Sequence, residues 1–200
     1  MASTLDVVNE CLATLGEVPL NTLAEPHEYK ASAQRYLARA NRRVQSVGYW
    51  FNTEVAVLPP SPATGHITLP ADASSWRSGS RARDTLTLGA PQPWLVQRGT
   101  RLYDTRTRSY THTEDAKGEL IREVPFEELP PVANDAVAAE AVLRFQSSFD
   151  ADNSKRQELG QSWAMATTAL KAENIRQAGV NLIQSSSRLQ RIKSRSARYN

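Results

Sequence analysis

The side chains that could bind a metal or act as a thiol nucleophile are few and widely spaced. The histidines are His27, His66 and His112, and Cys11 is the single cysteine. No short-spaced metal motif such as HExxH is present, and one cysteine can form neither an intrachain disulfide nor a thiolate zinc cluster. We therefore predict no metal and no cofactor. Cys11 borders the apolar face of a predicted helix, which indicates a buried, inert thiol.

Paired carboxylates are the remaining catalytic candidates. Glu127-Glu128 and Glu114-Asp115 are the most noticeable acidic pairs. A glycosidase needs two carboxylates about 5–10 Å apart across a cleft. Glu127-Glu128 directly precede Leu129-Pro130, where acidic residues at the start of a helix are expected anyway. No nucleophile-elbow, P-loop or dinucleotide-binding motif is present. The sequence therefore predicts a protein that is not an enzyme, with a polysaccharide hydrolase as an alternative.

The basic residues are concentrated near the C-terminus. The net charge is only +3, but no acidic residue follows Glu173. Arginines recur at spacings of three, four and three, and apolar residues fall on a neighbouring stripe. Such a helix would be too short and too polar to be stable alone, so we predict that it orders on a partner. The predicted binding residues are Arg188, Leu189, Arg191, Ile192, Lys193, Arg195, Arg198 and Tyr199. A frayed terminus and a nucleic-acid-binding tail are the alternatives.

The first 48 residues predict two helices. The apolar residues Leu5, Val8, Leu12 and Leu15 recur at helical spacing, with Ser3 or Thr4 as N-cap and Gly16 as the left-handed end. A second helix is expected to begin near Pro26 and to stop at Gly48. Its predicted apolar stripe is Tyr29, Ala33, Tyr36 or Leu37, Ala40, Val44 and Val47.

Residues 49–125 predict short antiparallel strands, because helical periodicity fades and turn residues accumulate. The expected strands are Trp50–Leu58, Ile67–Leu69, Thr85–Leu88, Trp94–Gln97, Arg101–Tyr103, Ser109–Thr113 and Leu120–Val124. They would form a small barrel or sandwich. Trp50, Trp94 and Trp163 are expected in the core, whereas Trp76, between serine and arginine, is expected to be exposed.

Helical periodicity returns after Pro130-Pro131. One stripe holds Ala138, Val142, Phe145 and Phe149, and a turn at residues 150–153 leads to another stripe of Leu159, Trp163, Ala166 and Leu170. We predict an α+β fold: an antiparallel helical bundle (residues 1–48 and 126–179), a β domain (49–125) inserted between its second and third helices, and an extended C-terminal tail (180–200). No signal peptide or membrane-spanning run is recognised, so synthesis and folding in a cytoplasm are expected.

Three segments resemble tail tubular protein A, the adaptor or gatekeeper family of short-tailed podophages of the Autographiviridae type. The first is Val7-Val8-Asn9-Glu10-Cys11-Leu12-Ala13-Thr14-Leu15-Gly16-Glu17, followed by Pro19 and Thr22-Leu23. The second is Asn41-Arg42-Arg43-Val44-Gln45-Ser46-Val47-Gly48-Tyr49-Trp50-Phe51-Asn52. The third is Val124-Pro125-Phe126-Glu127-Glu128-Leu129-Pro130, with residues 139–146. The three occur in the same order and at the same spacing as in the family.

This resemblance implies a structural role in the virion tail, at the head–tail junction. The family forms a dodecameric ring beneath the portal protein, and genomic DNA crosses the channel of the ring. Its C-terminal segment embraces the portal, its lower face receives the nozzle protein (tail tubular protein B), and its outer rim holds the N-termini of tail fibres. We expect these partners here, and the tail at 180–200 as the portal-docking segment.

Overall fold

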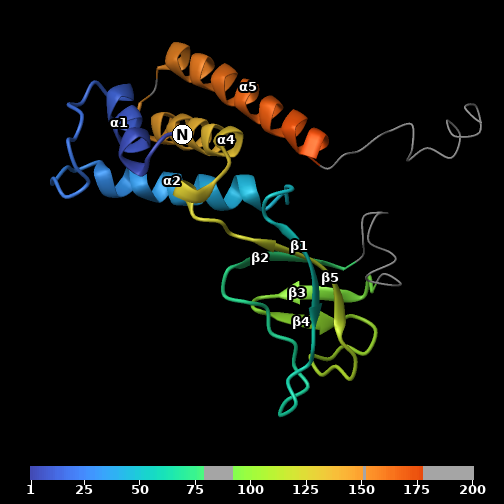
Figure 1. Ribbon diagram of the computed structural model, residues 1–200. Helices are drawn as coiled ribbons and strands as arrows, with labels where there is room; N and C mark the ends of the chain where they lie inside the picture. Colours follow the sequence, from blue (N-terminus) through green and yellow to red (C-terminus); the bar gives the residue numbers. More distant parts are fainter. Residues whose placement is uncertain (79–91, 151, 178–200) are drawn as a thin grey trace, which may run out of the picture.

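The computed structural model describes residues 1–78, 92–150 and 152–177. Its helices are α1 (Thr4–Thr14), α2 (Lys30–Gln45), α4 (Pro131–Phe149) and α5 (Asn153–Gln177), with a 3₁₀ turn η1 (Phe126–Glu128). Its strands are β1 (Thr53–Leu58), β2 (Ala73–Ser78), β3 (Leu95–Arg98), β4 (Arg101–Asp104) and β5 (Ala116–Arg122). Figure 1 shows the helices together at one end and the strands at the other. The predicted α+β class is confirmed.

Helix α4 is the centre of the helical core and contacts α1, α2 and α5. Its buried side includes Ala133, Ala136 and Ala141, whose small side chains let neighbouring helices approach closely. Phe145 is fully buried on the same helix. Burying a side chain of that size stabilises the fold by about 1.5–3 kcal/mol. The Ala-rich sequence thus gives a helix that can be covered on several sides.

Both predicted ends of α1 are confirmed. The Ser3 hydroxyl accepts from the Asp6 amide at 3.2 Å, and the Asp6 carboxylate accepts from the Ser3 amide at 2.8 Å, which is a capping box. At the other end Gly16 has φ +77°. The amides of Gly16 and Glu17 bond the carbonyls of Ala13 and Leu12, so the last turn closes as a Schellman motif.

Helix α2 begins at Lys30, and the prediction of a start near Pro26 was one turn too early. The Lys30 ammonium donates to the carbonyls of Leu23 (3.1 Å) and Glu25 (2.6 Å). The Tyr29 amide donates to His27 Nδ1 at 3.2 Å. These local bonds hold the residues before Lys30 in turns. The prediction that Val47 belongs to the apolar stripe was also wrong, because Val47 follows the end of the helix at Gln45 and is 54% exposed.

The strands form two antiparallel sheets, one in the order β1-β5-β2 and the other the pair β3-β4. Both sheets contribute to one buried cluster: Ile67, Leu69, Trp76, Leu95, Leu102, Ala116 and Leu120. Two short sheets around one core correspond to the small sandwich among the predicted alternatives. Ile67–Leu69 and Ser109–Thr113 were predicted as strands, but they take part only in isolated bridges. Thr85–Leu88 lies outside the described residues.

Strand β2 was not predicted, and Trp76 within it is 7% exposed rather than on the surface. Trp76 pairs with Leu120 of β5 and packs over Gly118. A Cβ at Gly118 would lie 2.6 Å from the Trp76 ring, so the ring occupies the space that glycine leaves open. The residues beside Trp76 in the sequence are polar and gave no strand pattern. The burial of Trp76 depends instead on the partner strand β5.

A buried polar network joins the strands to the helices. Gln45 Nε2 donates to the Val124 carbonyl at 2.8 Å, and Gln45 Oε1 accepts from the Val124 amide at 2.8 Å. Asn52 Nδ2 donates to the carbonyls of Gln45 and Arg122, both at 3.0 Å. Asn41 adds a bond to the Val124 carbonyl at 3.1 Å. These amides fix the two segments through which the chain passes between the helices and the sheets.

Candidate partner-binding surfaces

The predicted docking segment lies outside the described residues. This holds for all eight of its named positions: Arg188, Leu189, Arg191, Ile192, Lys193, Arg195, Arg198 and Tyr199. Its role therefore stays a prediction from sequence.

Glu127, one of the carboxylates weighed for catalysis, caps α1. Its Oε1 accepts from the Thr4 amide at 2.8 Å and from the Thr4 hydroxyl at 2.7 Å. A carboxylate at a helix N-terminus is stabilised by the free amides and the helix dipole. The acidic pair was expected to serve the start of the following helix, but Glu127 serves the first helix of the chain.

The histidines lie in separate contacts. His27 is 3.8 Å from the Glu17 carboxylate, His66 Nδ1 is 3.3 Å from Arg101, and His112 Nε2 is 3.1 Å from the Leu102 carbonyl. Across the described ranges, no group of three or more His, Cys, Asp or Glu residues is placed to hold a metal ion. Cys11 is fully buried, and its burial raises the pKa of the thiol to about 12. A thiol in that state is a poor nucleophile.

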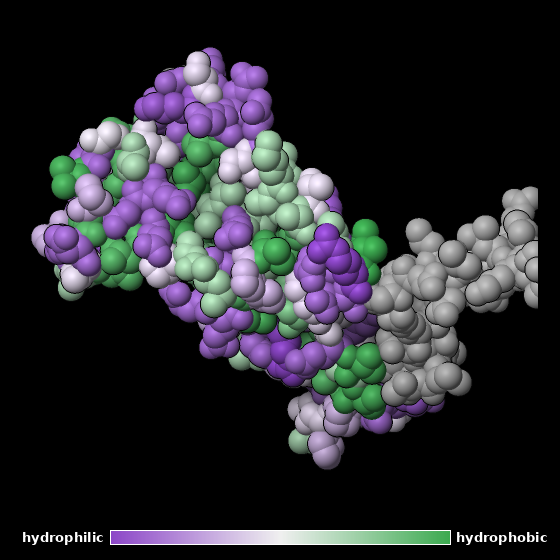
Figure 2. Space-filling view, turned by 45° about the horizontal axis from the view of Figure 1, so that its top comes forward, coloured by the Kyte–Doolittle hydropathy of each residue, from purple (hydrophilic) through white to green (hydrophobic). Residues whose placement is uncertain are grey.

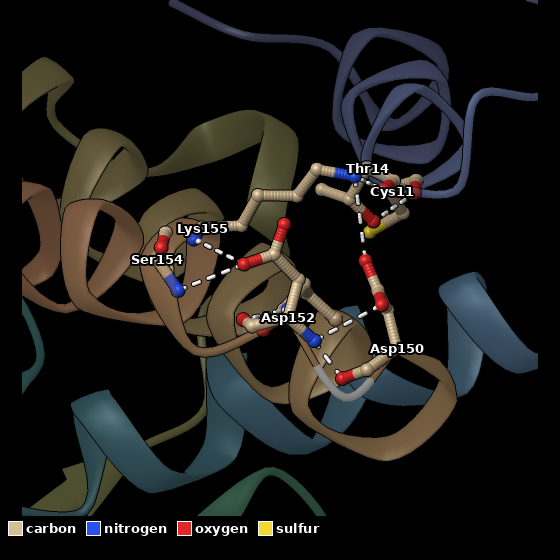
Figure 3. Close-up of polar contacts among 7 residues, drawn as sticks. Cys11, Thr14, Asp150, Asp152, Ser154 and Lys155 are labelled. Atoms are coloured by element: carbon tan, nitrogen blue, oxygen red, sulfur yellow. Dashed lines mark hydrogen bonds and ion pairs between the residues drawn. The ribbon is translucent and has the colours of Figure 1, made fainter.

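The turn between α4 and α5 is tied to the end of α1, as Figure 3 shows. The Lys155 ammonium donates to the Thr14 carbonyl at 3.1 Å and lies 3.4 Å from Asp150. The hydrogen bond from the Asp152 amide, and then the Lys155 ammonium, hold the pKa of Asp150 below its ordinary value. Asp152 accepts from the Ser154 amide at 2.8 Å and so caps α5. This polar cluster therefore has a structural role: it fixes the turn between α4 and α5 against the end of α1.

Helix α5 is long and largely uncovered. It has 25 residues, of which Leu170 is the one classed as buried among those described. Leu159 and Ala166 of the predicted stripe are half-buried and pack against the helical core. Trp163 was expected in the core but is only half-buried. Met165 is 71% exposed and Ile175 is 58% exposed. A helix of this kind gains most of its stability from tertiary packing, so its exposed sides are candidate contact surfaces.

A groove of about 620 Å³ opens where α2, α4 and α5 meet. We define the helical groove by its apolar lining: Val44, Val47, Tyr49, Trp163, Leu170 and Ile175. Arg43, Arg144 and Lys171 line it as well. This groove was not predicted from the sequence, because its walls come from segments far apart in the chain. The signal available was that Ile175 is apolar but lies outside the predicted stripe of its helix.

A second feature is an arginine ridge on α2. Arg35, Arg39 and Arg42 are exposed and lie at helical spacing on the outer side of the helix. Their side chains have no ion-pair or hydrogen-bond partner among the residues that the structure describes. Unpaired arginines on one face fit an acidic protein surface or a phosphate backbone.

Exposed apolar residues are scattered over both ends of the molecule. Figure 2 shows apolar side chains as separate patches between polar ones on the face turned toward the viewer. The large exposed ones are Met1, Val18, Val47, Val55, Val57, Phe149, Met165 and Ile175. Within the described ranges, none of the helices has the length and apolar character needed to cross a membrane. Apolar residues scattered singly in this way are normal on protein surfaces, so they do not by themselves mark a contact surface.

Comparison with known proteins gives the family of the chain. No curated protein matches the chain in sequence. A family model described as Tail tubular protein matches residues 5–188, which include every helix and strand of the structure from within α1 to the end of α5. All three segments that resemble the adaptor family lie within the matched range. The chain therefore belongs to the tail tubular protein family and is a structural protein of the phage tail.

Proposed function

We propose that this chain is the adaptor subunit that joins the portal protein to the tail nozzle of a short-tailed phage. Twelve copies would form a closed ring whose channel carries the genomic DNA during ejection. The nozzle protein, tail tubular protein B, would bind the lower face of the ring, and tail fibres would attach to its rim by their N-termini. Synthesis in the host cytoplasm would precede incorporation into the virion tail.

The exposure of α5 is the observation that supports this proposal most strongly. A 25-residue helix with one buried residue leaves apolar side chains such as Met165 and Ile175 without cover. Repeated lateral contacts between copies would cover them. A head-to-tail contact that closes on itself gives a ring.

Each segment of the chain has its own role in this proposal. Residues 1–48 and 126–179 form the helical domain that packs around the channel, residues 49–125 form the inserted β domain, and residues 180–200 dock on the portal. The two separate apolar clusters, one among the helices and one between the sheets, support this division. The buried amides of Asn41, Gln45 and Asn52 would keep the two domains in a fixed orientation.

Nucleic-acid binding is the second candidate function, and the arginine ridge of α2 favours it beside the basic tail. A binder of this kind would hold free DNA with an affinity that falls steeply with salt, because phosphate contacts release counterions. An adaptor needs no such affinity. Titration of labelled duplex DNA at several salt concentrations separates the two functions.

The adaptor function is tested by mixing the purified chain with assembled portal rings. We expect the chain to join the portal in a fixed ratio and to form a second ring on one of its faces. A chain that stays unbound at all concentrations would contradict the proposal.

A further inference from the structure

We propose that the helical groove of one copy receives the loop at residues 16–29 of the next copy, with Val18 at its centre. This inference rests on the proposed ring, for which it supplies the lateral contact. We call residues 16–29 the acidic loop, because it contains Glu17, Glu25 and Glu28 and no lysine or arginine. Val18, near the start of this loop, is 76% exposed.

The groove offers an apolar floor with a cationic rim. Glu140 is the one acidic residue in its lining, and it is buried between Arg43 at 3.0 Å and Arg144 at 3.7 Å. Lys171 has no ion-pair partner among the described residues. The rim therefore carries an excess of positive charge, which favours an apolar side chain flanked by carboxylates.

The acidic loop has that composition and is held rigidly. Asn9 bonds both the amide and the carbonyl of Leu20, at 2.8 and 2.9 Å. The Glu17 amide bonds the Leu12 carbonyl, and Lys30 holds the carbonyls of Leu23 and Glu25. A loop fixed before binding loses little conformational freedom when it docks.

The loop cannot fill the groove of its own chain. It leads into the first residue of α2, whereas Val44 and Val47 of the groove lie at the other end of that helix. The 16 residues of α2 span about 24 Å. Figure 1 likewise shows the loop beside α1 at one end of the bundle and the end of α5 at the opposite end. Complementary surfaces at opposite ends of one subunit produce a heterologous contact, which is the type that builds rings.

The C-terminal segment of the same chain is a less suitable occupant. Residues 178–200 contain five lysines and arginines and no acidic residue. The cationic rim of the groove would repel such a segment. A second copy of the chain is therefore the occupant that the charges favour.

Cysteine cross-linking on the portal tests the contact. Val18→Cys and Ile175→Cys are combined in one chain, which is mixed with portal rings and oxidised. We expect a ladder of covalent multimers on a denaturing gel, because each copy bonds two neighbours. Val18→Cys alone should give dimers at most. The pair Val18→Cys and Val57→Cys, with Val57 exposed on β1, is the matched control.

Electron microscopy of the same mixtures tests the groove contact separately from the adaptor function. Rings on the portal without a ladder beyond that of the control pair would overturn the groove contact and leave the adaptor function intact. Absence of rings would contradict the adaptor function and this inference together.

A charge exchange adds an independent measurement. Glu17→Lys and Lys171→Glu should each reduce ring assembly by roughly tenfold, and the double variant should regain most of the loss. Loss without any recovery in the double variant, with both single variants folded, would count against this pairing.

Discussion

At the scale of single residues, buried and half-buried side-chain amides connect separate parts of this chain through bonds to backbone groups. Asn9 binds the loop after α1, Asn134 binds both Ala2 and Phe126, and Asn52 binds three backbone groups. Each amide satisfies backbone groups that would otherwise be buried without partners. Asn9, Asn41, Gln45 and Asn52 lie in the segments that resemble the adaptor family, although their roles were not predicted.

Replacement of Asn52 by alanine tests this role. Asn52 Oδ1 accepts from the Tyr49 amide at 2.8 Å, and its Nδ2 donates to the carbonyls of Gln45 and Arg122. Loss of these bonds leaves buried polar groups unpaired, so we expect the free energy of unfolding to fall by about 2–4 kcal/mol. Urea unfolding measures it. The exposed Asn21→Ala is the control, and an equal effect of both changes would contradict the network.

Glu10 presents the opposite case, a charge that opposes folding. Glu10 is exposed, but partial desolvation of its carboxyl raises the pKa, and the nearby Asp6 and Asp135 raise it further. Because the folded state holds the proton more tightly, the charged form costs stability at neutral pH. We expect Glu10→Gln to raise stability at pH 7 by less than about 1 kcal/mol. The gain should disappear as the pH falls below the ordinary glutamate pKa. A gain that persists in acid, measured by thermal unfolding, would contradict this assignment.

At the scale of elements, the helices followed from the sequence better than the strands. The pattern Leu5, Val8 and Leu12 predicts α1 because one face of a helix must be covered, and Gly16 predicts its end. Burial of Trp76 could not be predicted in the same way, since it depends on Gly118 in a strand about 40 residues away. The helical groove also requires three helices to be placed together.

Two glycine replacements test the packing of these elements. Gly118→Ala should destabilise the fold by about 1–3 kcal/mol, because its Cβ would overlap the Arg77 carbonyl oxygen and lie 2.6 Å from the Trp76 ring. Gly160→Ala, in α5, meets no atom within 4 Å and should stabilise the helix by about 0.5–1 kcal/mol. Denaturant unfolding of both variants measures the difference. Equal effects of the same sign would show that Gly118 is not a packing position.

At the scale of the whole molecule, several exposed surfaces suit a subunit of a larger assembly. Its groove, acidic loop, arginine ridge and the uncovered sides of α5 are the surfaces for which we propose partners. We expect the free subunit to be mainly monomeric at micromolar concentration, with ring closure templated by the portal. The exposed surfaces would then be covered in the order in which the tail is assembled.

Deletion of Ser187–Asn200 tests the predicted docking segment. These residues lie outside the described range, and their arginine and Leu189/Ile192 stripes predict contact with the portal. We expect an unchanged thermal transition and loss of portal attachment in a pull-down with portal rings. Normal attachment would refute the assignment. Loss of DNA binding alone would favour the nucleic-acid function instead.

Electron microscopy of the full chain bound to portal rings is the most direct test of the adaptor function. We predict a closed ring of identical subunits stacked coaxially on one face of the portal, with an open central channel. The helices should lie around the channel, and each subunit should touch both of its neighbours. Subunits scattered singly on the portal, an open filament, or no bound density at all would contradict the claim that this protein is the adaptor ring.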